Sequence, residues 1–231
     1  RTGAAATRRT PRASSTTGRP SCFARGAKAA VARSTFGTFV DRFLEGYFAL
    51  DPSFAVYQGR HDFDGRLADW SEAGLKRDAA FLKASIAEAR GFRDAALSPD
   101  ERFERDYLVK VAEGRLFWLV EADRPHRNPA YYIGNGLDPN VYIARNYAAK
   151  PVRMRAFIAF AKRVPAAAAQ IRANLKMPMP LSYIDYGKAG FAGLASYHVG
   201  DAKAAFADVA DPALQAEAAA AAVAASKAMQ G

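Results

Sequence analysis

Hydrophobic side chains recur every three or four residues through most of the chain after residue 33, which is the spacing of one face of an α-helix. The most regular stretch begins at Ser34 or Thr35 and ends at Asp51-Pro52, because the residue before a proline is pushed out of the helical region. Similar periodicity predicts helices over 52–58, 71–96, 98–120, 138–147, 150–164, 165–175, 182–199 and 211–229. No stretch alternates in the manner of a β-strand. The sequence therefore predicts an all-α fold, an irregular array of about eight helices.

Two of these helices carry further expectations. Ser98-Pro99-Asp100-Glu101 has the residues of a capping box and is the clearest helix start. The helix that follows is apolar all round from Leu116 to Val120, so we expect it to be the central, buried helix. One predicted buried line on it is Phe103, Tyr107, Val111 and Trp118, and a neighbouring line is Leu108, Ala112 and Leu119.

The last helix is alanine-rich, and its apolar stripe is narrow. It opens at Asp211-Pro212 and extends to Met229. Such a stripe offers little to bury, so we expect it to pack against polypeptide beyond Gly231 or to self-associate through exposed apolar surface. On this interpretation the helical array is incomplete without a C-terminal half.

Two long polar loops interrupt the helices, over 59–74 and 123–140. Long loops in compact domains are often functional. The side chains that could face a cleft are His61, Asp64, Arg66, Asp69, Arg127, Tyr131 and Tyr132. The alternative is structural: Asp and Arg can stabilise their own loop, and Tyr packs well beneath one. The residues leave both interpretations open.

The charge is unevenly distributed. The chain carries a net charge of +10, but residues 1–33 contain eight Arg and Lys and no acidic residue, which leaves 25 basic and 23 acidic residues in 34–231. We therefore expect a disordered basic tail over 1–33 and a helical domain over 34–231. The tail resembles a transit peptide in composition, and no signal peptide or membrane-spanning run is predicted, so we expect a soluble protein. Nucleic-acid binding is not favoured, because the positive charge belongs to the tail.

Familiar catalytic motifs are absent from the sequence. The three histidines, His61, His126 and His198, lie more than fifty residues apart, and there is one cysteine. Neither a zinc-binding His-Glu-x-x-His, nor a Gly-x-Ser-x-Gly elbow, nor a phosphate-binding loop occurs. We assign no catalytic or metal-ligating residue in this chain. His198 falls on an apolar line near the end of its helix, which favours a place in the core or at the helix terminus.

A series of short motifs gives the chain a family resemblance. Phe-Leu-x-x-Tyr-x-x-Leu-Asp-Pro-Ser at 43–53 precedes Gly-x-His-x-x-Asp-Gly-Arg-Leu-x-Asp-Trp-Ser at 59–71. Leu-Ser-Pro-x-x-Arg-x-Glu-Arg-Asp-Tyr-Leu, Leu-Phe-Trp-Leu, Arg-Asn-Pro-x-Tyr-Tyr and Leu-Asp-Pro-x-Val-Tyr follow between 97 and 142. In this order they resemble the N-terminal half of the bacterial family catalogued as domain of unknown function 885.

The resemblance implies a function. Members of that family look like helical zinc metallopeptidases of the thermostable-carboxypeptidase type, with a His-Glu-x-x-x-x-Gly-His-type metal segment in their C-terminal half. This sequence ends at Gly231 before such a segment. We therefore expect the N-terminal helical region of a metal-dependent, peptidase-like hydrolase, inactive alone, with zinc bound only when the C-terminal half is present and a peptide as substrate. The alternative is a stand-alone helical module that binds a protein or peptide without catalysis.

Overall fold

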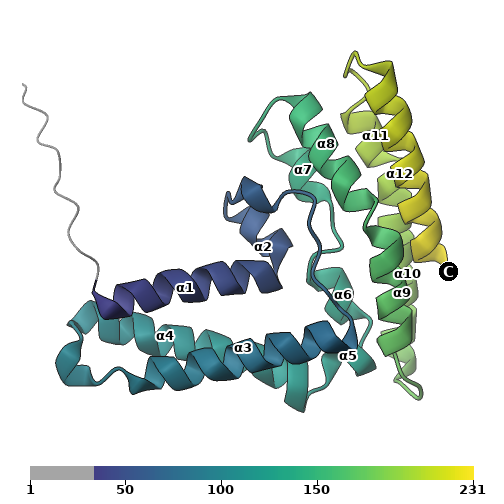
Figure 1. Ribbon diagram of the computed structural model, residues 1–231. Coiled ribbons are helices and arrows are strands. Elements are labelled where there is room, and N and C mark those ends of the chain that lie inside the picture. Colours follow the sequence, from purple (N-terminus) through teal and green to yellow (C-terminus); the bar gives the residue numbers. More distant parts are fainter. Residues whose placement is uncertain (1–33) are drawn as a thin grey trace, which may run out of the picture. The chain divides into compact units, whose positions relative to one another are not determined.

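The structure is a computed structural model that describes residues 34–231, so the predicted basic tail over 1–33 lies outside the described residues. Every regular element in the described part is helical, which confirms the all-α prediction (Figure 1). Seven long helices are α1 (Thr35–Leu50), α3 (Glu72–Gly91), α4 (Pro99–Leu116), α8 (Lys150–Ala161), α9 (Val164–Asn174), α10 (Leu181–Val199) and α12 (Pro212–Gln230). Five short helices are α2 (Pro52–Tyr57), α5 (Arg124–Arg127), α6 (Ala130–Gly134), α7 (Asn140–Ala144) and α11 (Asp201–Ala205).

The number of helices exceeds the expected eight because the predicted loops contain short helical turns. The stretch 123–140 was expected to be a long loop, but it holds α5 and α6, which begin around Pro125 and Pro129. Proline suits the first turn of a helix because its missing N–H has no partner there in any case. The stretch 59–74 contains one 3₁₀ turn, His61–Phe63.

Helix starts follow the predicted caps. The Ser34 side chain accepts a hydrogen bond from the Gly37 N–H, and Asp51 accepts one from the Phe54 N–H at the start of α2. Both halves of the capping box are formed, because the Glu101 N–H donates to Ser98 Oγ and the Ser98 N–H donates to Glu101 Oε2. These contacts satisfy backbone donors that have no partner inside the helix.

Helix α4 is not the central buried helix that the sequence suggested. It packs along α3, while Phe103 and Tyr107 are 71% and 64% exposed (Figure 1). The buried line is the neighbouring one, Leu108, Ala112 and Leu119. Both lines are apolar, and only the position of the partner helix decides which of them is covered. Helix α3 also ends at Gly91 instead of near Ala96, because Phe92 is extended and a separate 3₁₀ turn, Asp94–Ala96, follows.

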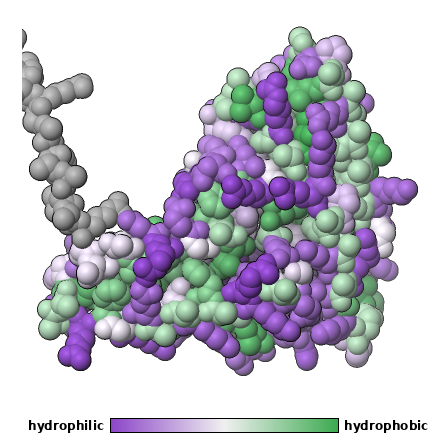
Figure 2. Space-filling model, in the orientation of Figure 1, coloured by the Kyte–Doolittle hydropathy of each residue, from purple (hydrophilic) through white to green (hydrophobic). Residues whose placement is uncertain are grey.

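Helix α12 is buried along its stripe within this chain. It packs against α8, α9 and α10 (Figure 1), and Leu214, Ala218, Ala221, Ala222, Ala225 and Met229 are all buried. The expectation that the stripe has nothing here to pack against is therefore corrected. Small alanine side chains let the neighbouring helices approach closely. Weakly hydrophobic, pale green residues remain along the edge of Figure 2 where α12 lies. Association through that outer side, where Val223 is 58% exposed, stays a prediction.

No helix within residues 34–231 is long and apolar enough to cross a bilayer.

Candidate functional site

The two polar stretches of the sequence are joined through Asn174, a buried side chain of α9. The Asn174 amide donates to the Trp70 carbonyl at 2.6 Å and to the Tyr132 hydroxyl at 3.0 Å. The Tyr132 hydroxyl in turn donates to the Pro125 carbonyl at 2.7 Å, and the Trp70 N–H donates to Gln170 Oε1 at 3.0 Å. Asn174 is 2% exposed, so these bonds replace lost water contacts. One helix thus fixes both polar stretches to each other.

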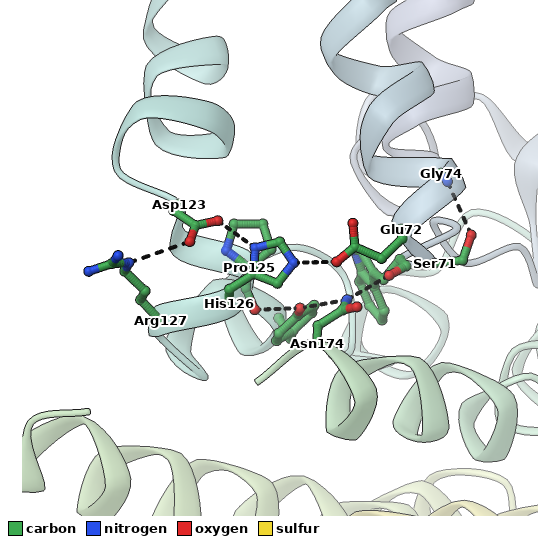
Figure 3. Close-up of polar contacts among 10 residues, drawn as sticks. Ser71, Glu72, Gly74, Asp123, Pro125, His126, Arg127 and Asn174 are labelled. Carbon is green, nitrogen blue, oxygen red and sulfur yellow. Dashed lines mark hydrogen bonds and ion pairs between the residues drawn. The ribbon is translucent and has the colours of Figure 1, made fainter. Parts of the chain in front are cut away.

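A second set of contacts joins the same stretches nearer the surface. His126 Nε2 lies 2.6 Å from Glu72 Oε1, and His126 Nδ1 bonds Asp123 Oδ1 (Figure 3). Arg127 Nε adds a longer contact of 3.4 Å to the other Asp123 oxygen. We refer to Glu72, Asp123 and His126 as the His126 clamp. Each ring nitrogen faces a carboxylate oxygen, so both nitrogens of His126 have a partner within the clamp.

The clamp keeps its carboxylates ionised. The hydrogen bond from His126 lowers the pKa of Glu72 below its ordinary value. Burial opposes ionisation of Asp123, but hydrogen bonds from His126 and Arg127 outweigh it, and the pKa of Asp123 is also lowered. Because carboxylates occupy both nitrogens, His126 has no nitrogen left for a substrate proton. The clamp is therefore a structural contact between the two stretches, and it does not provide a general base.

An irregular turn carries the chain from α4 into the clamp. Phe117–Glu121 is a π-helical turn, closed by a 2.8 Å hydrogen bond from the Ala122 N–H to the Phe117 carbonyl. Asp123 then has φ of 48°, the left-handed region that Asp tolerates better than most residues. Single π-turns are frequent at functional sites. Here the turn leaves Trp118 50% exposed, with the Arg124 guanidinium 4.8 Å from its ring centroid.

Two cavities share Trp118 and Arg124 as lining residues. One has a volume of about 740 Å³ and the other about 330 Å³, and both are lined by Trp118 and Arg124. We call the combined surface the Trp118 trough. Its lining includes the cations Lys110, Arg115, Arg124, Arg127 and Lys176, the aromatic residues Tyr47, Trp118, Tyr131 and Tyr183, and the single carboxylate Asp123. Lys110, Arg115 and Arg127 already pair with Glu113, Asp51 and Asp123. Arg124 and Lys176 are therefore the lining cations without an ion pair within residues 34–231, and they lie among aromatic walls.

The smaller cavity of the trough, which is lined by Arg115 and Tyr131, is poorly solvated. Arg115 donates to the Tyr47 hydroxyl and to Asp51 Oδ2, both at 3.1 Å. Burial raises the pKa of Tyr131 to about 12 and that of the nearby Asp78 to about 6. A cation held in such surroundings attracts an anion more strongly than one in bulk water.

The predicted residues of the first polar stretch stabilise the stretch itself. His61 Nδ1 lies 3.2 Å from Asp64 Oδ1, and its ring stacks on Tyr147 at 3.6 Å. The Tyr147 hydroxyl donates to the other Asp64 oxygen at 3.0 Å. Arg66 lies over the Phe63 ring at 4.8 Å.

The remaining predicted residues are divided among three places. Asp69 accepts hydrogen bonds from Gln170 at 3.0 Å and from the Ser71 N–H at 3.1 Å. Arg127 and Tyr131 line the Trp118 trough. Tyr132 is fully buried beneath it and has no exposed surface to offer a substrate. Contact of any of these side chains with a substrate stays a prediction.

Several residues of the site were not predicted from the sequence. Gln170 and Asn174 lie four residues apart on a helix whose one other polar side chain is Arg172, and this spacing places the two amides on one face and could have revealed them. Trp118 was placed on a buried line. Nothing in the sequence links Glu72 to His126, 54 residues later.

The described residues do not fit a metal ion. Within 34–231 no group of three or more His, Cys, Asp or Glu side chains is arranged to hold one. The His126 clamp is hydrogen-bonded to itself. The expectation that zinc would bind through further chain stays a prediction.

Comparison with known proteins gives two findings. Residues 52–231 match the family model described as "Bacterial protein of unknown function (DUF885)". The solved structure described as "a putative lipoprotein of unknown function from Shewanella oneidensis" has a similar fold, with a TM-score of 0.74, 24% sequence identity and 85% of this chain covered. This chain spans 36% of that protein's length. No curated protein matches.

Proposed function

Because this chain belongs to the bacterial protein family DUF885, we propose that it forms a substrate-binding wall of a metal-dependent, peptidase-like hydrolase. The catalytic metal would be held by residues other than those described. The substrate we propose is a peptide that carries carboxylate groups. The family resemblance in the sequence supports the hydrolase class, and the Trp118 trough supports the choice of substrate.

The trough is the observation on which the proposal depends. Its two cavities, of about 740 and 330 Å³, have the size of ligand sites. Arg and Lys side chains pair with carboxylates, while Trp and Tyr give flat walls for apolar side chains. Arg124 serves both purposes, because its guanidinium lies over the Trp118 ring and lines both cavities.

The overall charge favours a peptide over a polynucleotide. Residues 34–231 contain 25 Lys and Arg against 23 Asp and Glu, so the trough is a local cationic surface in a nearly neutral unit. Binding of a long polyanion relies on many phosphate contacts spread over a basic face. Three of the five lining cations already pair with carboxylates of this chain, so the trough offers two, Arg124 and Lys176, and fits a ligand with one or two carboxylates.

The described residues have three roles in this proposal. Arg124, Arg127 and Lys176 neutralise carboxylates of the peptide, and Trp118 packs against its side chains. The His126 clamp and Asn174 hold the wall in shape so that little ordering is needed on binding. When bound in a complete enzyme, a zinc ion would supply an activated water.

Tryptophan fluorescence offers a direct test. Trp118 is half exposed and the only other tryptophan, Trp70, is buried, so a ligand in the trough would change the Trp118 emission. We expect saturable binding of a peptide with Asp side chains and a free C-terminus. Its analogue with Asn and a C-terminal amide should bind about tenfold more weakly, because charge-assisted hydrogen bonds are lost. Arg124→Gln should remove the difference, and the control Lys83→Gln on exposed α3 should not.

The outcomes separate the alternatives. Equal affinity for the two peptides would contradict the proposal, as would displacement of the peptide by a single-stranded oligonucleotide at lower concentration. Zinc-dependent peptide hydrolysis by this chain alone would overturn the assignment of the metal to other residues. Peptide binding without hydrolysis in longer family members would favour the alternative, a binding module without catalysis.

A further inference from the structure

His198 has one ring nitrogen without a partner. The ring is completely buried near the end of α10, and Nδ1 lies 2.8 Å from the Leu194 carbonyl. A carbonyl only accepts, so Nδ1 carries the proton and donates. Burial lowers the pKa of His198, which keeps the ring neutral. Nε2 is then an acceptor, and it is the one buried side-chain polar atom within residues 34–231 that has no hydrogen-bond partner in the chain.

The same ring lines a cavity that is separate from the Trp118 trough. Its volume is about 390 Å³, and it lies between α8, α12 and the segment from the end of α10 to Phe206. Met154, Phe157, Phe206 and Ala222 are among its apolar lining residues, and besides His198 the polar ones are Lys203 and Gln215. Gln215 already donates to the Phe206 and Val209 carbonyls at 2.6 and 3.1 Å.

A buried acceptor without a donor is costly, and native proteins seldom retain one without a reason. The lining beside it is mostly apolar, so it offers a water molecule few of the hydrogen-bond partners that an ordered water needs. An apolar molecule with one donor group would fill the space, and its donor would satisfy the nitrogen once the side chain that covers Nε2 has moved. We propose that this cavity binds a small apolar molecule bearing a hydroxyl group, with the hydroxyl donating to His198 Nε2.

The chemistry of the site limits the ligand. An ionised carboxylate has no donor and would place its charge against the Nε2 lone pair. A hydrocarbon would fill the cavity but leave the nitrogen unpaired. An alkylphenol or medium-chain alcohol meets both requirements, and 390 Å³ holds a molecule larger than benzene. Nε2 itself is covered, so the hydroxyl must displace a side chain. Met154 lines the cavity and has the flexibility to move.

A matched pair of probes tests the proposal on the whole chain. 4-Propylphenol and propylbenzene differ only in the hydroxyl group, and calorimetry gives the affinity of each. We expect the phenol to bind about tenfold more tightly, as one buried hydrogen bond predicts. His198→Phe should abolish that preference and still bind propylbenzene. Ala222→Leu fills the cavity and should weaken both probes.

Histidine ¹⁵N NMR of the unmodified chain gives a second readout that does not depend on the folding of a variant. The phenol should shift the His198 Nε2 resonance toward that of a hydrogen-bonded nitrogen, and propylbenzene should not. Equal affinities of the two probes, no binding of either, a preference that survives His198→Phe, or an unmoved Nε2 resonance at saturating phenol would each overturn the proposal.

Discussion

Two histidines of this chain are placed in opposite surroundings. His126 sits between two carboxylates, and both of its nitrogens have partners. His198 lies in an apolar region among α8, α10 and α12, and one of its nitrogens has none. The polar contacts around His126 hold two distant stretches of chain together. The unpaired nitrogen of His198 contributes no such bond. The difference indicates that the contacts of His126 are structural, whereas His198 Nε2 is an acceptor that a ligand could use.

The strongest test of the polar region is removal of Asn174. Asn174→Ala leaves the Trp70 carbonyl and the Tyr132 hydroxyl short of a partner in a buried site. We expect a loss of about 3 kcal/mol in the free energy of unfolding, measured by urea denaturation. Gln230→Ala, at the exposed end of α12, is the control. A loss no larger than the control's would mean that α9 does not hold the two stretches together.

Breaking the clamp should cost less, because it lies nearer the surface. His126→Gln should lower the free energy of unfolding by about 1 kcal/mol at pH 7. The lowered pKa values of Glu72 and Asp123 mean that their stabilisation is present above the ordinary carboxylate range and is lost as pH falls through the lowered values. The difference between variant and wild type should therefore shrink below about pH 4. A difference that stays constant from pH 7 to pH 3 would argue against the clamp.

Replacement of His198, in the apolar region, should not lower the free energy of unfolding as replacement of His126 does. His198→Phe removes an unpaired acceptor and should leave stability at pH 7 unchanged or raise it by up to about 1 kcal/mol. The lowered pKa of His198 means that the unfolded chain takes up a proton near pH 6.5 that the folded chain does not, so wild-type stability falls below that pH. The advantage of His198→Phe should grow from pH 7 to pH 5.5 in thermal melts. A variant that is less stable at both pH values would remove the contrast between the two histidines.

The smallest effect on stability is expected at Asp78, which lies near Tyr131 and Arg115 but outside the clamp. Burial raises its pKa to about 6, so above that pH the folded protein bears the cost of an ionised, poorly solvated carboxylate. Asp78→Asn should raise the melting temperature by about 2 °C at pH 7.5 and have little effect at about pH 3.5, below the ordinary pKa of an Asp. Equal shifts at the two pH values would show that burial does not control this carboxyl group.

The sequence predicts best what is decided locally. Ser98 forms the predicted capping box, and α1 and α2 begin next to Ser34 and Asp51 where the sequence places helix starts, because a cap needs only the residues within one turn of it. The all-α class follows from many such local signals. Burial of a side chain depends on neighbours from any part of the chain, and two predictions about burial were wrong. The aromatic line of α4 was expected inside and is exposed, while the alanine stripe of α12 was expected open and is covered.

The site was predictable only in part for the same reason. Arg127 and Tyr131 were named and do line the Trp118 trough. The pairing of Glu72 with His126 depends on how α3 meets α5, and no local pattern encodes it. The outward position of Trp118 depends on a π-turn, which continues the same apolar run that an ordinary helix would use. The roles of residues that act through such tertiary contacts could be identified only from the structure.

The binding of a carboxylate-bearing peptide in the Trp118 trough is the central claim, and NMR titration tests it most directly. With ¹⁵N-labelled protein, addition of the Asp-containing peptide should shift the indole N–H of Trp118 and the Arg124 side-chain resonance, in a saturable manner. The buried indole of Trp70 should move far less. Shifts confined to α12, or no shift at Trp118 at saturating peptide, would contradict the account.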